Sequence, residues 1–112
     1  MITRRAVTLG LAAMAVPGVA QAQQVRRRAM EEIFEALSYE RRTRIQQVLS
    51  AAGIYKLGID GLYGPGTEAG LIKGARYLNR RSNNAAGIDL STRDGIIDYY
   101  RGILTGRYAA YY

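Results

Sequence analysis

The side chains of this chain that could do chemistry are acids, arginines and tyrosines. The sequence contains no His and no Cys, which excludes a thiol nucleophile, a histidine general base and the common zinc ligand sets. Carboxylate-based cleavage of a glycoside needs one or two positioned acids, and the candidates are Asp60, Glu68, Asp89, Asp94 and Asp98. A turn explains Asp60 better, the first turn of a helix explains Glu68, and a helix cap explains Asp94. We therefore expect no catalytic residue, no metal and no cofactor, and we predict that the protein is not an enzyme.

Binding is the class of function that the remaining side chains favour. Tyr supplies nine of the ten aromatic residues, and a ring can pack on the face of a sugar. An Arg side chain can hold a carboxylate through two parallel hydrogen bonds. Two tyrosines flank an Asp-Gly turn, and a Thr and an Arg lie on the helix expected after it. The predicted ligand-binding residues are Tyr55, Asp60, Tyr63, Thr67 and Arg76.

Residues 58–67 read Gly-Ile-Asp-Gly-Leu-Tyr-Gly-Pro-Gly-Thr and join two segments with helical apolar spacing. Asp60-Gly61 is a turn pair, because Gly adopts a positive φ without a Cβ penalty. Gly64-Pro65 predicts a helix start, since Pro at the first helical position loses only an N–H that has no helical partner. This ordered set, placed after a helix that ends at Ala52-Gly53, resembles the peptidoglycan-binding-like repeat family over residues 38–79.

The resemblance implies a small helical module of the kind often attached to cell-wall hydrolases, with peptidoglycan as its ligand. It implies a buried residue at Tyr63, which competes with a ligand role for that ring, while Tyr55 stays open between the two roles. The loop residues are expected to shape the loop and the helix start rather than to touch the ligand; they are Asp60, Gly61, Gly64 and Thr67.

The chain departs from the family at Gly74-Ala75, where a Phe-Gln pair is common. The lost ring leaves space that the additional helices around Met30 and after Thr92 are expected to fill. The departure favours a second hypothesis, in which an envelope interaction subunit keeps the fold and has lost glycan binding. Its partner surface would be a flat ridge made of Gly66, Gly70 and Gly74, or the tyrosines Tyr99, Tyr100, Tyr108, Tyr111 and Tyr112. The last few residues of the chain are expected to be disordered.

The N-terminal segment has the pattern of a secretory signal peptide. Arg4 and Arg5 precede an uncharged apolar run over residues 6–19, and Ala20-Gln21-Ala22 is a small-x-small cleavage site. The run is too short and too rich in Ala and Gly for a stable membrane span. The Arg pair is also compatible with twin-arginine export. We predict a signal peptide over residues 1–22, cleavage between Ala22 and Gln23, and a periplasmic domain over residues 23–112.

Charge and Cys content set bounds on the partners of the predicted mature chain. Its 90 residues carry 14 Lys and Arg against nine acids, a net charge of +5. Such a charge suits anionic wall polymers, an anionic membrane surface or an acidic partner, and the absence of Cys excludes a disulfide framework. Because an exported protein rarely meets nucleic acid, we expect peptidoglycan or another envelope protein as the partner, and no nucleic acid.

Apolar spacing predicts an all-α fold, with a three-helix peptidoglycan-binding-like core and an additional C-terminal helix. The first stripe is Met30, Ile33, Phe34 and Leu37. Ser38 is expected to cap the second helix, and Gly53 to end it in a Schellman motif. The third helix is expected to begin at Pro65. The fourth follows Ser91, whose spacing to Asp94 resembles a capping box, and ends at Gly106.

The predicted cleavage can be tested by the mass of the exported protein. We expect intact-mass measurement of envelope fractions to give a chain that begins at Gln23, because Ala22 ends the small-x-small site. A full-length species retained in the cytoplasm would contradict the prediction. As a control, replacing Ala20 and Ala22 by bulky residues should block cleavage, so that the envelope fraction no longer contains a chain that begins at Gln23.

Overall fold

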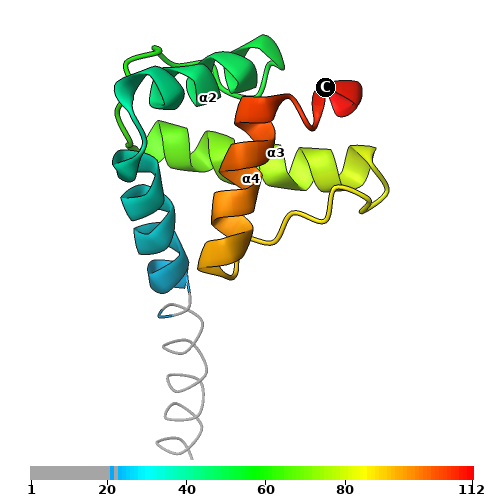
Figure 1. Cartoon of the computed structure of the whole chain (residues 1–112), viewed down its shortest axis with the longest axis horizontal. Coiled ribbons are helices and arrows are strands. Elements are labelled where there is room, and N and C mark those ends of the chain that lie inside the picture. The colour runs from blue at the N-terminus through cyan, green and yellow to red at the C-terminus, as the bar shows by residue number, and fades with distance from the viewer. Residues whose placement is uncertain (1–20, 22) are drawn as a thin grey trace, which may run out of the picture.

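The computed structural model describes residue 21 and residues 23–112, and in this part the chain is all-α, with no strand (Figure 1). Its α-helices cover residues 23–36, α2 (Tyr39–Ala51), α3 (Pro65–Arg81) and α4 (Arg93–Thr105), and a short 3-10 helix, η1 (Ala109–Tyr111), follows. The all-α prediction is confirmed. The predicted signal peptide lies outside the described residues apart from Gln21. Within the described part, no helix has both the length and the apolar character needed to cross a membrane.

The ends of α2 are those that the sequence predicts. The Ser38 hydroxyl accepts a hydrogen bond from the Arg41 N–H at 3.2 Å, which satisfies an N–H in the first turn. At the other end, the Ile54 N–H donates to the Leu49 carbonyl at 2.9 Å and the Gly53 N–H donates to the Ser50 carbonyl at 2.9 Å. Gly53 has a φ of 76°. These two bonds and this φ are the Schellman motif, which turns the chain sharply into the next loop.

The cap of α4 differs from the prediction by one residue. Thr92 caps the helix, because its hydroxyl accepts from the Gly95 N–H at 3.0 Å. The Ser91 hydroxyl instead donates to Asp89 at 2.6 Å, and Asp89 also accepts from the Ser91 N–H. Ser91 therefore belongs to a turn held by Asp89, and the predicted capping box from Ser91 to Asp94 is wrong.

The core lies where helix 23–36 and α4 run side by side and α2 and α3 pack against α4 (Figure 1). The Tyr100 hydroxyl donates to the Met30 carbonyl at 2.8 Å, and the Tyr99 hydroxyl donates to the Leu71 carbonyl at 2.8 Å. Both rings are buried with their polar ends satisfied, so they link α4 to the first helix and to α3. The largest buried side chains around them include Phe34, Ile45, Leu49, Leu78, Ile96 and Ile103.

The glycine ridge of α3 is covered by the protein itself. A Cβ on Gly74 would lie 2.7 Å from the Tyr99 hydroxyl oxygen, and one on Gly70 would lie 3.3 Å from the Tyr55 ring. At Gly66 a Cβ would collide with Leu57. The prediction that this ridge docks another protein is therefore wrong, because α4 and the loop after α2 already use the close approach that the glycines permit. Tyr99 of α4 occupies the space opposite Gly74.

The C-terminal tyrosines also pack inward. Tyr99, Tyr100 and Tyr108 are buried, and the Tyr108 ring lies against Gly102. Tyr111 and Tyr112 are half-buried, and Arg81 donates to the Tyr111 carbonyl at 3.3 Å. The predictions of a disordered tail and of an exposed tyrosine surface are wrong, because a tight turn after α4 returns the tail onto the core.

The packing of this tail can be measured by unfolding. We expect Tyr108→Ala to lower the free energy of unfolding by about 3–5 kcal/mol, the usual cost of removing a large buried ring. Tyr108→Phe is the control, since it removes only a hydroxyl that has no hydrogen-bond partner in the described residues, and it should stay close to wild type. Equal stability of Tyr108→Ala and wild type in thermal unfolding would show that the tail does not pack in solution.

Candidate functional site

Gln46, a buried residue of α2, holds the loop between α2 and α3 in place from the core side. Its side-chain oxygen accepts from the N–H groups of Asp60 at 3.1 Å and Gly61 at 2.9 Å. Its Nε2 faces three acceptors, the Asp60 carboxylate at 3.3 Å, the Leu62 carbonyl at 3.2 Å and the Thr67 hydroxyl at 3.2 Å. One side chain therefore satisfies backbone groups that have no helix or sheet to pair with.

Arg42 holds the same loop one turn earlier on α2. Its Nε donates to the Gly61 carbonyl at 2.7 Å, and its Nη1 donates to the Leu37 carbonyl at 2.7 Å. Residues four apart lie on the same face of a helix, so Arg42 and Gln46 form one polar strip along α2. Through Arg42, this strip also ties the loop to the end of helix 23–36.

Asp60 and Gly61 make the turn that the sequence predicts. The Asp60 carboxylate accepts from the Leu62 N–H at 2.9 Å, and this bond, followed by that from Gln46, lowers the pKa of the exposed Asp60 carboxyl below its usual value. Gly61 has a φ of 74°, a region that favours glycine. A Cβ at Gly61 would also lie 2.7 Å from the ring of Tyr39, a side chain that is 61% exposed, so the positive φ is the main reason for Gly here.

The start of α3 is joined to this turn by Thr67. The Thr67 hydroxyl donates to the Leu62 carbonyl at 3.1 Å while it accepts from Gln46. Gly64 is the N-cap and Pro65 the first residue of α3, as predicted. The predicted role in shaping the loop and the helix start therefore fits Asp60, Gly61, Gly64 and Thr67.

The two predicted ligand-binding rings have different surroundings. Tyr55 is only 5% exposed, its ring lies against Gly70, and its hydroxyl donates to the Gly58 carbonyl at 2.7 Å. Its face is therefore not available to stack on a sugar, which corrects the prediction of a ring offered to ligand. Tyr63 is half-buried, with its ring centroid 5.5 Å from that of Phe34, so it also belongs partly to the core.

The Tyr63 hydroxyl reaches the surface beside α3. It donates to the Glu68 carboxylate at 3.3 Å, and burial together with the Glu68 charge raises the pKa of Tyr63. Glu68 also pairs with Arg27 at 3.5 Å. Tyr63 is thus a neutral donor at ordinary pH, placed where the loop meets the first turn of α3.

Arg76 is not at this site. It is exposed on α3, eleven residues after Pro65, or about 16 Å along the axis at the usual rise of 1.5 Å per residue. The prediction that Arg76 and the loop share one cleft is wrong for this reason. Arg76 instead belongs to an exposed basic face of α3 that also includes Lys73 and Arg80, at helical spacings of three and four residues.

The remaining acidic candidates have structural surroundings of their own. Asp98 pairs with Arg107 at 2.8 Å, Asp89 holds the turn at Ser91, and Asp94 lies in the first turn of α4. In the described ranges, no group of three or more acidic, Cys or His side chains could hold a metal ion.

A shallow hollow of about 330 Å³ lies on the outer side of the loop. Four of the predicted ligand-binding residues line it, Tyr55, Asp60, Tyr63 and Thr67. Two apolar side chains in its lining face solvent, since Leu57 is 61% exposed and Leu62 is 64% exposed. A second hollow of about 320 Å³ adjoins it at Tyr63, Gly64 and Pro65, and Glu31 and Glu68 line its far side.

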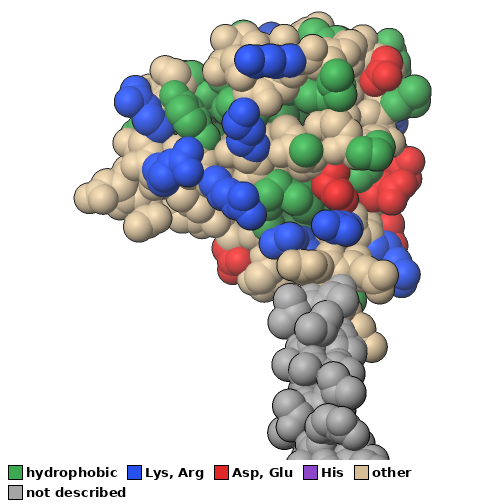
Figure 2. Space-filling model, turned by 180° about the vertical axis from the view of Figure 1, so that it is seen from behind, with side chains coloured by type: hydrophobic (Ala, Val, Ile, Leu, Met, Phe, Trp, Pro, Cys, Tyr) green, Lys and Arg blue, Asp and Glu red, His purple; other side chains and the backbone are tan. Residues whose placement is uncertain are grey.

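Lys and Arg side chains are spread across the face of the protein seen in Figure 2, and most of the acidic side chains there lie towards one side. This view is from behind Figure 1, where α3 lies behind α4. Ion pairs in the described residues join Arg27 to Glu68, Arg93 to Glu32, and Arg107 to Asp98. None of these pairs uses the basic residues of α3.

Sequence reasoning missed Gln46, Arg42 and the exposed pair Leu57 and Leu62. One signal could have found Gln46: it is a polar residue between Ile45 and Leu49, which both lie on the buried face of α2. A buried polar side chain needs partners, and a loop without regular structure is a natural source of them. The sequence gives no sign that Leu57 and Leu62 are exposed, because an apolar residue in a loop can be either buried or exposed.

No family model matches the chain, and no curated protein or solved structure matches it either. The resemblance of residues 38–79 to peptidoglycan-binding-like modules therefore stays a prediction.

The role of Gln46 can be tested with its neighbour as the control. We expect Gln46→Ala to lower the free energy of unfolding by about 1–3 kcal/mol, because the Asp60 and Gly61 N–H groups would lose their acceptor. Gln47→Ala changes an exposed Gln one residue later and should cost less than about 0.5 kcal/mol. Denaturant unfolding measures both, and equal values for the two variants would remove Gln46 from its assigned role.

Proposed function

We propose that this protein is an exported, non-enzymatic peptidoglycan-binding module that acts as an accessory or scaffold protein in the periplasm. The observation that carries the proposal is the hollow beside the Asp60–Thr67 loop, with Leu57 and Leu62 exposed at its lining. Its loop is fixed in advance by Gln46 and Arg42. A preformed site loses little conformational entropy when it binds, which favours affinity.

The chemistry of the hollow suits a glycan with attached peptide. The exposed Leu57 and Leu62 side chains can pack on the apolar face of a sugar or on an alanine methyl group. In the described residues, only one oxygen of the Asp60 carboxylate accepts hydrogen bonds, which leaves Oδ2 to accept from a sugar hydroxyl or an amide N–H. Sites of this kind combine an apolar lining with a few placed polar groups.

The two adjoining hollows suit a polymer rather than a single sugar. They meet at Tyr63, Gly64 and Pro65, so a ligand chain could continue from one into the other across the start of α3. The Tyr63 hydroxyl lies at this junction as a polar group next to Glu68. In this proposal Tyr55 supports the wall of the hollow from inside, and Arg76 attracts the polymer from a distance without contacting the bound segment.

The basic surface supplies attraction over a longer range. Peptidoglycan carries carboxylates on its peptide stems, and a positive protein is drawn towards such a polymer. Exposed charges are screened at about 0.1 M salt beyond roughly 10 Å, so this contribution weakens as salt rises. Apolar contacts in the hollow do not weaken in this way, and the two contributions can therefore be separated by experiment.

Sedimentation with purified insoluble peptidoglycan tests the proposal. We expect the double variant Leu57→Ala and Leu62→Ala to weaken binding about tenfold or more, since burying one such side chain contributes about 1.5 kcal/mol and each 1.4 kcal/mol is a factor of ten. Val25→Ala is the matched control, because Val25 is also strongly exposed but lies outside both hollows. The helical circular dichroism signal should be the same in all variants.

Two outcomes would contradict this assignment. If binding disappears at moderate salt and ignores Leu57 and Leu62, only general attraction to the basic surface is left. If no binding occurs at any salt, the alternative applies, an envelope interaction subunit that keeps the fold without glycan binding. In that case the exposed loop itself would be the first surface to examine, since the glycine ridge of α3 is already covered.

A further inference from the structure

A separate groove of about 430 Å³ lies between helix 23–36 and α4. Ile33 and Leu37 line it from the first helix, and Ile97 and Leu104 line it from α4. The groove shares no lining residue with the two hollows beside the loop. It is therefore a second candidate surface that wall binding does not use.

The apolar part of the groove has the spacing of a helix-binding surface. Ile33 and Leu37 are four residues apart, and Ile97 and Leu104 are seven apart, so each helix presents one row of side chains. The rows extend about 10 Å along α4 at 1.5 Å per residue. Ile97 is 37% exposed and the other three are half-buried, so nothing in the described chain fills the space between the rows.

The floor of the groove is rigid. It is made by Tyr100, which is 2% exposed and whose hydroxyl donates to the Met30 carbonyl at 2.8 Å. The Tyr100 ring also meets the Phe34 ring edge-on, with centroids 6.1 Å apart. Because these contacts join the two helices directly, the spacing between the rows is set before any partner arrives.

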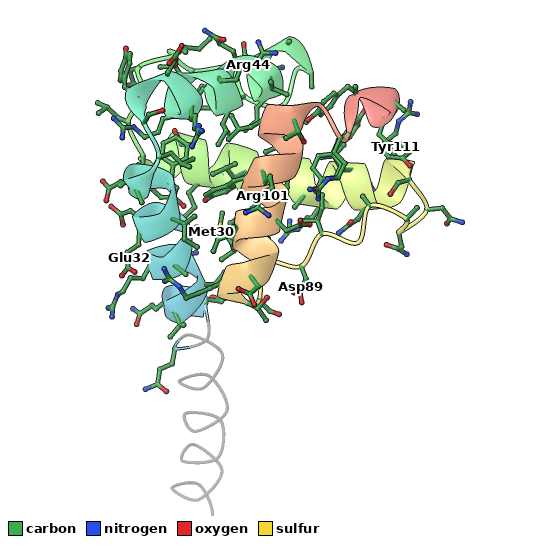
Figure 3. All side chains as sticks on the ribbon, viewed as in Figure 1. Met30, Glu32, Arg44, Asp89, Arg101 and Tyr111 are labelled. Carbon is green, nitrogen blue, oxygen red and sulfur yellow. The ribbon has the colours of Figure 1, made fainter. Side chains whose placement is uncertain are left out.

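Two arginines also line the groove. Arg41 belongs to the first turn of α2 and Arg101 to α4, and both are exposed. Figure 3 labels Arg101 on α4 and Met30 on the neighbouring first helix, the two elements that border the groove. Neither arginine belongs to any of the ion pairs in the described residues, which use Arg27, Arg93 and Arg107.

We propose that this groove docks an acidic amphipathic helix of a partner protein. Two helices that lie side by side leave a groove into which the apolar face of a third helix can pack. Carboxylates next to that face would meet Arg41 and Arg101, whose guanidinium groups can each hold a carboxylate through two hydrogen bonds. The charge complementarity selects an acidic helix over a basic one.

The surface does not suit a single lipid chain as well as it suits a helix. The groove is open along its length and only about two helical turns long. A flexible acyl chain would lose its conformational freedom there while staying partly exposed, whereas an amphipathic helix that is already ordered loses less. A membrane surface is therefore an outcome that the test must distinguish.

The test uses the exported chain that begins at Gln23, which contains every residue of the groove, and a labelled synthetic helix of about four turns, with Leu at i, i+4 and i+7 and Glu at the flanking positions. Fluorescence anisotropy should show saturable binding, with a dissociation constant on the order of 10 μM. The same helix with Lys in place of Glu should bind at least tenfold more weakly. Vesicles with and without anionic lipid, added as separate probes, show whether the groove prefers a membrane surface.

Variants locate the binding. We expect Arg41→Glu with Arg101→Glu to weaken binding of the Glu helix at least tenfold and to strengthen binding of the Lys helix. The matched control is Arg28→Glu with Arg44→Glu, which makes the same change in net charge at exposed positions outside the groove and should change binding less than threefold. Ile97→Ala, which removes apolar contact without changing the charge, should also weaken binding of the Glu helix. Circular dichroism checks that each variant is folded.

Three results would overturn the proposal. One is the absence of saturable binding of the Glu helix. Another is an equal loss in the groove pair and the control pair, which would indicate attraction to net charge alone. The third is binding to anionic vesicles that depends on Arg41 and Arg101 while the helix does not bind. The proposal does not rest on wall binding, and the sedimentation experiment can succeed or fail independently of it.

Discussion

The amide side chain of Gln46 is the constraint on which the rest of this site depends. The segment between α2 and α3 has no regular structure, so its backbone groups need partners from elsewhere. Gln46 supplies them from inside the core, as acceptor to Asp60 and Gly61 and as donor towards Leu62 and Thr67. The loop is therefore fixed against α2. Its position in turn fixes the start of α3 and the two hollows that loop residues line.

Three contacts in the core place a Tyr ring against a glycine of α3 or α4. Tyr55 lies on Gly70, Tyr99 on Gly74, and Tyr108 on Gly102. Each glycine inside α3 or α4 weakens its helix by roughly 1 kcal/mol relative to Ala, and close packing of the rings offsets that cost. At Gly74 the ring that fills the space comes from α4, since a Cβ there would meet the Tyr99 hydroxyl.

The two proposed surfaces have different chemistry and different residues. The hollows beside the loop combine exposed apolar side chains with the Asp60 carboxylate and the Tyr63 hydroxyl. The groove between helix 23–36 and α4 combines apolar rows with Arg41 and Arg101. An accessory protein that binds a polymer through one surface and a partner through the other would act as a scaffold, and mutations in either surface should leave the other intact.

The sequence by itself determined the helices, their ends and the turn. Apolar spacing, Ser38, Gly53, Asp60-Gly61 and Gly64-Pro65 act over a few residues, so their effects can be predicted without knowing what packs where. The shift of the α4 cap from Ser91 to Thr92 was a local error of one residue, caused by competition from Asp89 for the Ser91 hydroxyl.

Only the tertiary structure decided which surfaces are free. The sequence pattern is the same whether Tyr55, the glycine ridge and the tail tyrosines face solvent or core. In the structure they are covered, because α4, the loop and the returning tail pack against them. Arg76 was assigned to the loop by nearness in sequence, although a straight helix carries it away. Burial and proximity are properties of element pairs far apart in the chain, which local patterns do not encode.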